Sequence, residues 1–492
     1  MPLKYTVEEI TVKLLLIAGV VLSLLQFLYN RSLWVDEAML ALNIIHKTGF
    51  ELLNPLDYGQ VAPILFLQIE KLFSILLPNT EYGLRIFPLL CYWAAIYFFY
   101  KIIKIQLHNV YAVIIALSFF VLNTLFVLYA SEVKQYIIDV FVLTIIFYLI
   151  IKEYKSERNK YYALGIVGAL SVFLSNVAPI ILFTAGLYLL YTHFFVSKQK
   201  IVSLLVVFVT WLSFFSVYYY FFIYEHPTRE FMVAYWSGLE NAFLPYHSFG
   251  DCCKFISVKR AILLGALFPR FTLAAPIIQM ILLPAFLAGI LSLIIKKKWE
   301  ILILTCTPPV LHLFLSAFQL YPFALRLVLY TLPCIIIICS TGFLFIIKLL
   351  FSRLKIKQYR FFILLLPISL FLFGYPFKEK KQEIKETIKY IQTNRNENEN
   401  IYVHSSAFAA SQYYETIDMP LSMIYIGSYS DQTIDDDEYI SALKKLRGKN
   451  WLLFTYSPED EKHITDQLDV CYKRLKTFHT TGSSAYLYDF GE

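Results

Sequence analysis

Eleven stretches of the sequence are long, mostly apolar runs of the kind that cross a bilayer as helices. A hydrocarbon core of about 30 Å needs roughly 17 or more consecutive apolar residues in a helix, whereas the strands of a membrane barrel show short alternating segments. The pattern therefore predicts a polytopic α-helical membrane protein with about eleven transmembrane helices, near residues 11–28, 84–103, 110–129, 136–151, 161–175, 177–195, 201–224, 272–295, 299–318, 324–348 and 361–376.

Residues 62–78, APILFLQIEKLFSILLP, are also apolar but differ from these spans. Gln68, Glu70 and Lys71 interrupt the run, which favours an amphipathic helix lying at the membrane interface over a twelfth crossing.

Short basic clusters fall between the spans on one side only. By the positive-inside rule these loops are cytoplasmic, so the N-terminus lies inside and the C-terminal tail lies outside. The other side then receives the first loop (29–83), the turn at Glu132, the large loop 225–271 and the tail. The basic residues that set this topology are Lys101, Lys104, Lys152, Lys155, Arg158, Lys160, Lys198, Lys200, Lys296, Lys297, Lys298, Arg353, Lys355, Lys357 and Arg360.

Composition supports this interpretation, because 58% of the residues are hydrophobic and only 16% are charged. Residues 375–492 hold 14 Lys and Arg against 19 Asp and Glu, a net charge of −5. Since the whole chain carries +7, residues 1–374 carry +12. This positive charge is spread over separate short loops. It indicates topology and gives no reason to expect a nucleic-acid partner.

The cysteines and the N-terminus give little indication of function. Seven cysteines lack metal-site spacing, and adjacent Cys252 and Cys253 are expected to be free thiols rather than a strained vicinal disulfide. The N-terminal MPLKYTVEEITVK carries Glu8 and Glu9 and has no small-residue cleavage pattern, so the first helix is expected to be a permanent anchor.

The tail, residues 377–492, alternates helix and strand patterns and is predicted to be a soluble extracytoplasmic α/β domain. Ile384, Ile388 and Ile391 share one helical face, and the runs IYVHS, MIYIG, WLLFTY and AYLYDF are typical of strands. Because it contains no nucleotide or zinc motif, an accessory or substrate-positioning role is favoured over a second active site. The membrane domain is then 1–376, with the first loop 29–83 and the loop 225–271.

Two adjacent carboxylates, Asp36 and Glu37, follow the first span in SLWVDEAMLALNII. One interpretation is structural: Asp36 caps the next helix while Trp34 anchors at headgroup depth. The other is a general base, with the second carboxylate binding a divalent cation or fixing an acceptor.

Other charged residues lie near the same predicted face. Glu132 and Lys134 sit between the third and fourth spans, and Asp139 lies within the fourth. Arg326, late in the membrane part, and Arg85, at the second span, either snorkel to the interface or bind a phosphate with their planar donors. No role is assigned to the remaining loop and tail candidates, His226, Arg229, His247, Lys254, Arg260 and His404.

In order and topological side, these pieces resemble the GT-C class of membrane glycosyltransferases, within it the bacterial relatives of protein O-mannosyltransferases and the lipid A aminoarabinose transferase. The resemblance covers most of residues 10–376, and the tail looks like the soluble domain that many such proteins carry. Relatives often have a charged or histidine residue before a Pro-Pro pair, where this chain reads Gln60, Val61, Ala62 and Pro63. The matching stretches are LWVDEAMLA, GQVAPILFLQIEKLF, EYGLRIFPLL, YASEVKQYIID and YPFALRLVLYTLP.

The resemblance implies a bacterial inner-membrane enzyme that transfers a sugar, with inversion, from a polyprenyl-phosphate donor to a lipid, glycan or protein acceptor at the extracytoplasmic face. In this picture Asp36 takes the proton from the acceptor hydroxyl. Glu37 and Glu132 position the acceptor or a divalent cation. Lys134 and Arg326 neutralise the departing phosphate, and Arg85 is a further candidate contact.

Two other classes of protein fit the pattern less well. An envelope polysaccharide polymerase or ligase is expected to use arginines of the large loop, for which Arg229, Arg260 and Arg270 are available. A transporter or flippase usually shows paired halves and polar or Gly/Pro-broken helices at the membrane midplane. No internal repeat is visible in the sequence, and the ionisable residues cluster near one face instead.

Overall fold

The computed structural model describes residues 6–78, 80–154, 156–196, 201–238, 241–268, 275–353, 359–374, 378, 380–417, 422–425, 436–455 and 458–491. The chain divides into two compact units. Unit 1 comprises residues 1–27, 62–66 and 87–377, and unit 2 comprises residues 28–61, 67–86 and 378–492. Most of the first loop, which the sequence assigned to the membrane domain, is therefore grouped with the tail.

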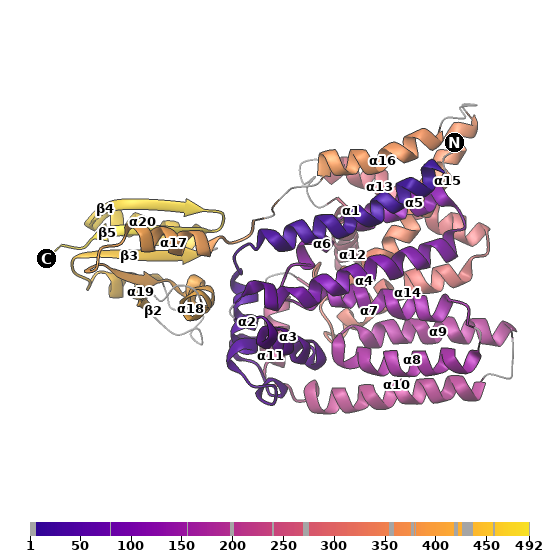
Figure 1. Ribbon diagram of the computed structural model, residues 1–492, viewed down its shortest axis with the longest axis horizontal. Helices are drawn as coiled ribbons and strands as arrows, with labels where there is room; N and C mark the ends of the chain where they lie inside the picture. The colour runs from indigo at the N-terminus through magenta and orange to yellow at the C-terminus, as the bar shows by residue number, and fades with distance from the viewer. Residues whose placement is uncertain are drawn as a thin grey trace. The chain divides into compact units, whose positions relative to one another are not determined.

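Unit 1 is built of helices (Figure 1). Two of them, α1 and α4, continue into unit 2 at one end. The helices are α1 (Val7–Tyr29), α4 (Glu81–Leu107), α5 (Val110–Val121), α6 (Thr124–Tyr129), α7 (Tyr136–Ile151), α8 (Glu157–Leu174), α9 (Ala178–Val196), α10 (Ile201–Phe222), α11 (Arg229–Gly238), α12 (Phe249–Gly265), α13 (Ala275–Ile295), α14 (Trp299–Ala317), α15 (Leu332–Arg353) and α16 (Tyr359–Gly374).

Five described helices are long and apolar enough to cross a membrane. Five others are apolar but shorter, so the count of eleven spans stays a prediction. The long segments are Val7–Tyr29, Glu81–Leu107, Val202–Phe222, Trp299–Ala317 and Leu329–Phe351, and the shorter ones are Val110–Val121, Tyr136–Ile151, Ala178–Phe194, Gln279–Ile295 and Arg360–Leu372.

The predicted span 110–129 is not one helix. It breaks at Asn123, whose side-chain oxygen accepts hydrogen bonds from the backbone N–H groups of Leu125 and Phe126 and so caps the start of α6. Asparagine competes well for such backbone donors, which is why a short polar side chain can end an otherwise continuous apolar run. The prediction also missed two helices within the loop 225–271, α11 and α12.

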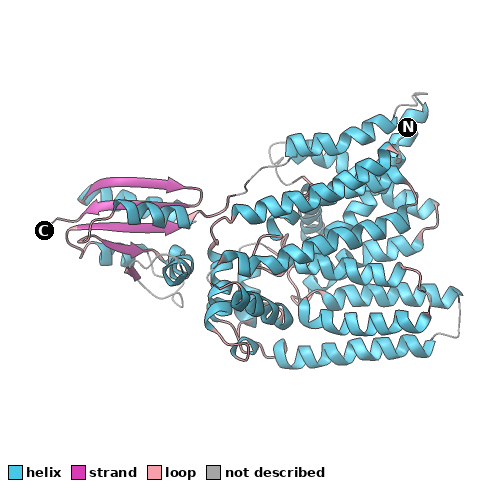
Figure 2. Cartoon of the chain, in the orientation of Figure 1, coloured by secondary structure: helices cyan, strands magenta, loops and turns pink. Residues whose placement is uncertain are grey.

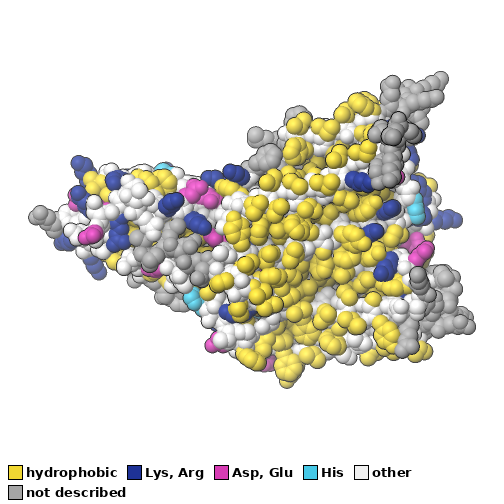
Figure 3. All heavy atoms as spheres, viewed as in Figure 1, with side chains coloured by type: hydrophobic (Ala, Val, Ile, Leu, Met, Phe, Trp, Pro, Cys, Tyr) yellow, Lys and Arg dark blue, Asp and Glu magenta, His cyan; other side chains and the backbone are white. Residues whose placement is uncertain are grey.

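Hydrophobic side chains cover much of the visible surface of unit 1 (Figure 3). On α10, where only 22% of the most apolar window is buried, Val202, Val206 and Val209 are all exposed. Such a continuous apolar surface is unfavourable in water and matches the hydrocarbon of a bilayer.

The first-loop part of unit 2 contains α2 (Val35–His46), the short helices η1 (Glu51–Leu53) and η2 (Asp57–Gly59), and most of α3 (Ile64–Leu76). The polar face predicted for α3 does not face water throughout. Lys71 Nζ donates to the carbonyls of Ile44 and Ile45 at the end of α2, both at 2.9 Å. Glu70 is fully buried, and this burial raises the pKa of its carboxyl well above the ordinary value.

The tail forms a five-stranded mixed sheet with helices, shown in magenta and cyan in Figure 2. The strand order is β2-β1-β3-β5-β4; β1 runs parallel to β2 and β3, and β5 is antiparallel to β3 and β4. The elements are α17 (Ile384–Asn394), β1 (Asn400–Val403), η5 (Ser405–Ala407), α18 (Phe408–Ile417), β2 (Met423–Tyr425), α19 (Asp436–Leu443), β3 (Lys449–Thr455), α20 (Pro458–Cys471), β4 (Lys473–Thr480) and β5 (Ser483–Asp489).

The α/β alternation expected of the tail is confirmed, including the four predicted strands and the apolar face of α17. Ile384, Ile388 and Ile391 are all completely buried. His404 is also buried, beside Tyr439 and Phe454, and burial lowers its pKa to about 4. Cys252 and Cys253 are free, as expected.

Candidate functional site

The two adjacent carboxylates of α2 have different surroundings. Glu37 is completely buried, and its carboxylate forms ion pairs with Arg31 Nη1 at 2.9 Å and Arg85 Nη2 at 3.2 Å. Both arginines are also buried, so the Glu37 carboxylate compensates part of their positive charge inside the protein. Arg85 Nη1 additionally donates to the backbone carbonyl of Arg31 at 2.7 Å.

This network gives structural partners to two residues that the sequence singled out. Glu37 was expected to position an acceptor or a cation, and Arg85 to contact a phosphate. Both roles stay predictions. The two side chains are 1% exposed or less and bind each other, so they hold the loop that precedes α2. The sequence could not show this, because Glu37 and Arg85 are 48 residues apart.

Asp36, in contrast, is only partly buried. One of its carboxylate oxygens accepts a hydrogen bond from Gln60 Nε2 at 3.4 Å. The N-cap position of α2 is Trp34, which makes no side-chain capping bond. Asp36 is the member of the pair that keeps access to solvent.

The tail supplies the missing cap of α2. The N–H of Val35 donates to Gln382 Oε1, and the N–H of Leu33 donates to the hydroxyl oxygen of Tyr414, both at 2.8 Å. The first N–H groups of a helix lack partners within it, so these two side chains satisfy backbone donors next to Asp36.

A second set of contacts fixes the same segment. Glu81 accepts hydrogen bonds from Lys385 Nζ at 2.9 Å and from the Tyr414 hydroxyl at 3.2 Å. The backbone N–H of Lys385 donates to Ser32 Oγ at 3.1 Å, and Lys381 Nζ lies 3.3 Å from the centre of the Trp34 ring. The position of Asp36 thus depends on residues more than 340 positions later in the chain.

In unit 1, Glu132 and Lys134 occupy the turn between α6 and α7. Their exposed fractions are 0% and 4%, and Lys134 N–H donates to the Glu132 carbonyl at 2.7 Å. Asp139 is buried in α7 and accepts a hydrogen bond from Ser175 Oγ at 2.5 Å. Buried charges are costly without compensation, so this turn is an unusual place for an acid and a base.

Arg326 lies in the turn before η4 (Leu329–Thr331) and is partly exposed. Its guanidinium carbon is 4.7 Å from the centre of the Trp236 ring, and Nη2 donates to the Tyr235 hydroxyl at 3.4 Å. The two aromatic residues belong to α11 and hold the guanidinium plane in one orientation.

The other candidates contribute less. Arg229 and Arg260 are exposed, and Arg260 donates to Ser257 Oγ within its own helix, whereas Arg270 lies outside the described residues. Within the described ranges, no group of three or more His, Cys, Asp or Glu side chains could hold a metal ion.

Some residues of this arrangement carried no sequence signal. Gln382 lies just before α17 and Tyr414 lies in α18, and only the folded chain brings them to α2. His312, buried in α14 and bonded to the Tyr330 hydroxyl and the Pro322 carbonyl, was likewise missed.

Comparison with solved structures identifies the fold. The crystal structure of ArnT from Cupriavidus metallidurans bound to undecaprenyl phosphate matches with a TM-score of 0.54, at 10% identity, over 97% of both chains. The apo structure of the same protein matches with a TM-score of 0.50, at 11% identity, over 96% of this chain and 97% of that one. No protein-family model and no curated protein sequence matches the chain.

ArnT is the lipid A aminoarabinose transferase and has the GT-C fold. The chain therefore has the fold of a GT-C membrane glycosyltransferase and is an integral membrane protein, as the sequence predicted.

Proposed function

We propose that this protein transfers a sugar from a polyprenyl-phosphate donor to a lipid, glycan or protein acceptor of the cell envelope. The observation that carries the proposal is the likeness, over 97% of the chain, to a glycosyltransferase whose crystal structure contains undecaprenyl phosphate. The separate environments of Asp36 and Glu37 support it, because one carboxylate builds the site and the other is left accessible for proton transfer.

In the proposed reaction Asp36 accepts the proton of the acceptor hydroxyl. The hydroxyl oxygen forms a bond to the anomeric carbon of the sugar while the bond from that carbon to the phosphate oxygen breaks, with inversion. A carboxylate is a suitable base for this step, since full proton transfer is needed only as the new bond forms. The buried network around Glu37 and the cap from Gln382 and Tyr414 hold Asp36 in place.

The departing polyprenyl phosphate gains negative charge as the bond breaks. Arg326 is proposed to stabilise this charge, because its guanidinium is oriented by Tyr235 and Trp236 and stays protonated at any physiological pH. Lys134 is proposed as a second positive charge on the phosphate, and Glu132 as the residue that positions it or the acceptor. No step is assigned to a divalent cation.

The reaction is proposed to occur at the extracytoplasmic face of the bacterial inner membrane. The charge pattern supports this location, since the positive-inside rule assigns the basic loops to the cytoplasmic side and the first loop and acidic tail to the other side.

The experiment that tests the donor class uses purified protein in lipid vesicles. A panel of radiolabelled polyprenyl-phosphate sugars and the matching nucleotide sugars is incubated with an envelope extract, and label is followed into product. Transfer from a polyprenyl-phosphate sugar and not from its nucleotide counterpart is expected. Transfer only from nucleotide sugars, or from neither by folded protein, contradicts the proposal.

A further inference from the structure

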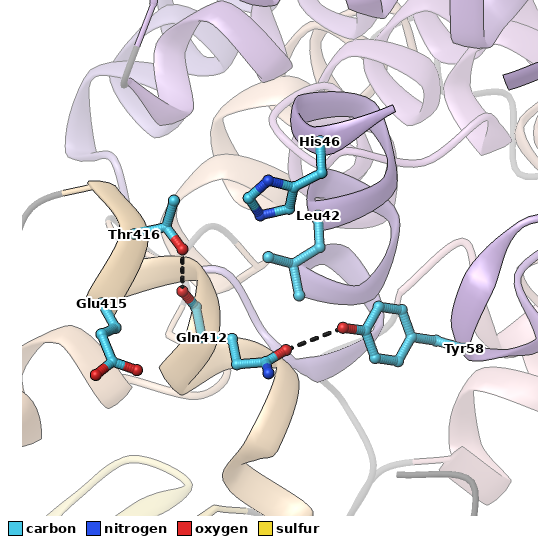
Figure 4. Close-up of a pocket in the computed structure, with 6 residues that line it drawn as sticks. All are labelled: Leu42, His46, Tyr58, Gln412, Glu415 and Thr416. Carbon is cyan, nitrogen blue, oxygen red and sulfur yellow. Dashed lines mark hydrogen bonds between the residues drawn. The ribbon is translucent and has the colours of Figure 1, made fainter. Parts of the chain in front are cut away.

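Unit 2 contains a cleft between the first loop and the tail. It has a volume of about 400 Å³ and is lined by Leu42 and His46 of α2, Tyr58 of η2, and Gln412, Glu415 and Thr416 of α18. In Figure 4, the side chains of His46, Leu42 and Tyr58 line one side and those of α18 line the other. Its size lies within the range of small-molecule sites.

The six described lining residues are rich in hydrogen-bonding groups, and none of them is a lysine or arginine. An imidazole, a phenol, an amide, a carboxylate and a hydroxyl surround a single aliphatic side chain, Leu42. Without a lysine or arginine on its wall the cleft does not favour a phosphate or another anion, and its polarity does not favour a lipid chain. A ligand with many hydroxyl groups matches this mixture of donors and acceptors, and the Tyr58 ring offers it an apolar face.

Tyr58 is held in an uncommon conformation. Its φ and ψ angles are 61° and 25°, in the left-handed region that an aromatic residue rarely adopts. The Tyr58 hydroxyl donates to Gln412 Oε1 at 2.9 Å (Figure 4). Residues held in such conformations cluster at functional sites, because the surrounding structure must offset the strain.

Several polar groups of the cleft retain hydrogen-bonding capacity. The Gln412 carbonyl is used by Tyr58, but within the described part of the chain its amide N–H₂ group makes no bond. His46 is exposed and its ring makes no hydrogen bond to any described residue. Glu415 is engaged by the Tyr425 hydroxyl at 2.7 Å, which leaves His46 and Gln412 as the principal groups available to a ligand.

The cleft and the proposed base lie on the same helix. His46 follows Asp36 by ten residues in α2, which corresponds to about 15 Å along a helix axis. A single sugar cannot reach across this length, whereas a short saccharide chain can.

We propose that the cleft binds the saccharide chain of the acceptor and that the acceptor is therefore a neutral oligosaccharide or a molecule carrying one. The proposal rests on the glycosyltransferase function and narrows the acceptor class. It makes His46, Tyr58 and Gln412 determinants of acceptor binding, and it leaves the chemical step to Asp36.

The test measures saccharide binding without transfer. Neutral oligosaccharides and monosaccharides released from the envelope by mild acid are separated by size, labelled with a fluorophore and titrated against full-length protein in lipid nanodiscs. Wild type, Asp36→Asn, His46→Ala and Gln412→Leu are compared. Gln392→Leu, on the exposed surface of α17, is the matched control for Gln412→Leu.

Wild type, Asp36→Asn and Gln392→Leu are expected to bind a trisaccharide fraction with equal affinity and to bind monosaccharides more weakly. His46→Ala and Gln412→Leu are each expected to weaken trisaccharide binding roughly 3- to 10-fold, the loss of about one hydrogen bond. His46 is exposed, so its variant reports on binding even if Gln412→Leu disturbs the fold.

The two proposals fail separately. If no fraction binds, or if His46→Ala and Gln412→Leu both bind as wild type does, the cleft proposal is wrong, even where transfer depends on Asp36. If the cleft variants lose binding and yet no polyprenyl-phosphate sugar is transferred, the cleft stands as a saccharide site and the proposed reaction is wrong.

Discussion

Replacing Glu37 by Gln should loosen α2, whereas replacing its neighbour Asp36 by Asn should not. Glu37 is fully buried and compensates two buried guanidinium groups, those of Arg31 and Arg85, at 2.9 and 3.2 Å. Its neutral analogue leaves those positive charges uncompensated, and breaking a buried ion pair in this way costs about 3–5 kcal/mol. Asp36 is partly exposed and loses little when its charge is removed.

Hydrogen exchange of the α2 amides in lipid nanodiscs measures this difference. A cost of about 3 kcal/mol corresponds to roughly 100-fold faster exchange through local opening of the helix in Glu37→Gln. Asp36→Asn should exchange within about threefold of wild type. Equal protection of α2 in wild type and Glu37→Gln would refute the assignment of Glu37 to a structural network.

A triple variant separates lost charge compensation from lost shape. Replacing Arg31, Glu37 and Arg85 together by Met removes all three charges, and such replacements are often neutral or stabilising in buried networks. We expect the triple variant to recover at least half of the protection lost in Glu37→Gln. If the α2 amides of the triple variant are less protected than those of Glu37→Gln, hydrogen bonds to the backbone contribute more to the stability of α2 than the charges do.

Three further predictions concern the phosphate, the tail and pH. Arg326→Ala should weaken binding of undecaprenyl phosphate roughly 10- to 100-fold, as expected for a lost charged hydrogen bond. Direct titration measures this affinity, with Trp236→Leu as a comparison. An unchanged affinity would mean that Arg326 only snorkels to the interface. Tyr414→Phe should lower kcat several-fold without changing lipid affinity, because the Leu33 N–H loses its acceptor next to Asp36. An unchanged kcat would contradict the role of Tyr414 in positioning Asp36. Burial lowers the pKa of His404 to about 4, below the ordinary 6.5, so the unfolded tail takes up a proton first as the pH drops. The stability of the tail should therefore fall between pH 6.5 and pH 4. Hydrogen exchange of the β3 amides, corrected for intrinsic rates, should become faster over this range in wild type, and this pH dependence should be absent in His404→Phe.

Much of the architecture followed from sequence because it depends on local patterns. Apolar runs of helical length, the Ile384, Ile388 and Ile391 face and four β-rich runs all report on burial that is regular along the chain. Strand β4 was missed, because it is an edge strand in which no residue is fully buried, and its charged sequence KRLKTFHT lacks the apolar alternation of its neighbours.

The candidate site was less accessible to sequence reasoning, because its geometry depends on distant residues. Nothing local distinguishes Asp36 from Glu37; the distinction arises because Arg85, 48 positions later, reaches only one of them. Similarly, the cap from Gln382 exists only once the tail has folded against the first loop within unit 2. The role of Asp36 as base remains a prediction that chemistry must test.

The most direct test of that role is the rate of sugar transfer by Asp36→Asn in lipid vesicles, measured beside Asp57→Asn. Asp57 lies in the same loop with a 65% exposed side chain, so its variant controls for the removal of a carboxylate charge. Loss of a general base typically lowers the rate about 10²- to 10⁴-fold, and we expect that loss for Asp36→Asn and wild-type transfer for Asp57→Asn. Transfer by well-folded Asp36→Asn within a few fold of wild type would contradict the account.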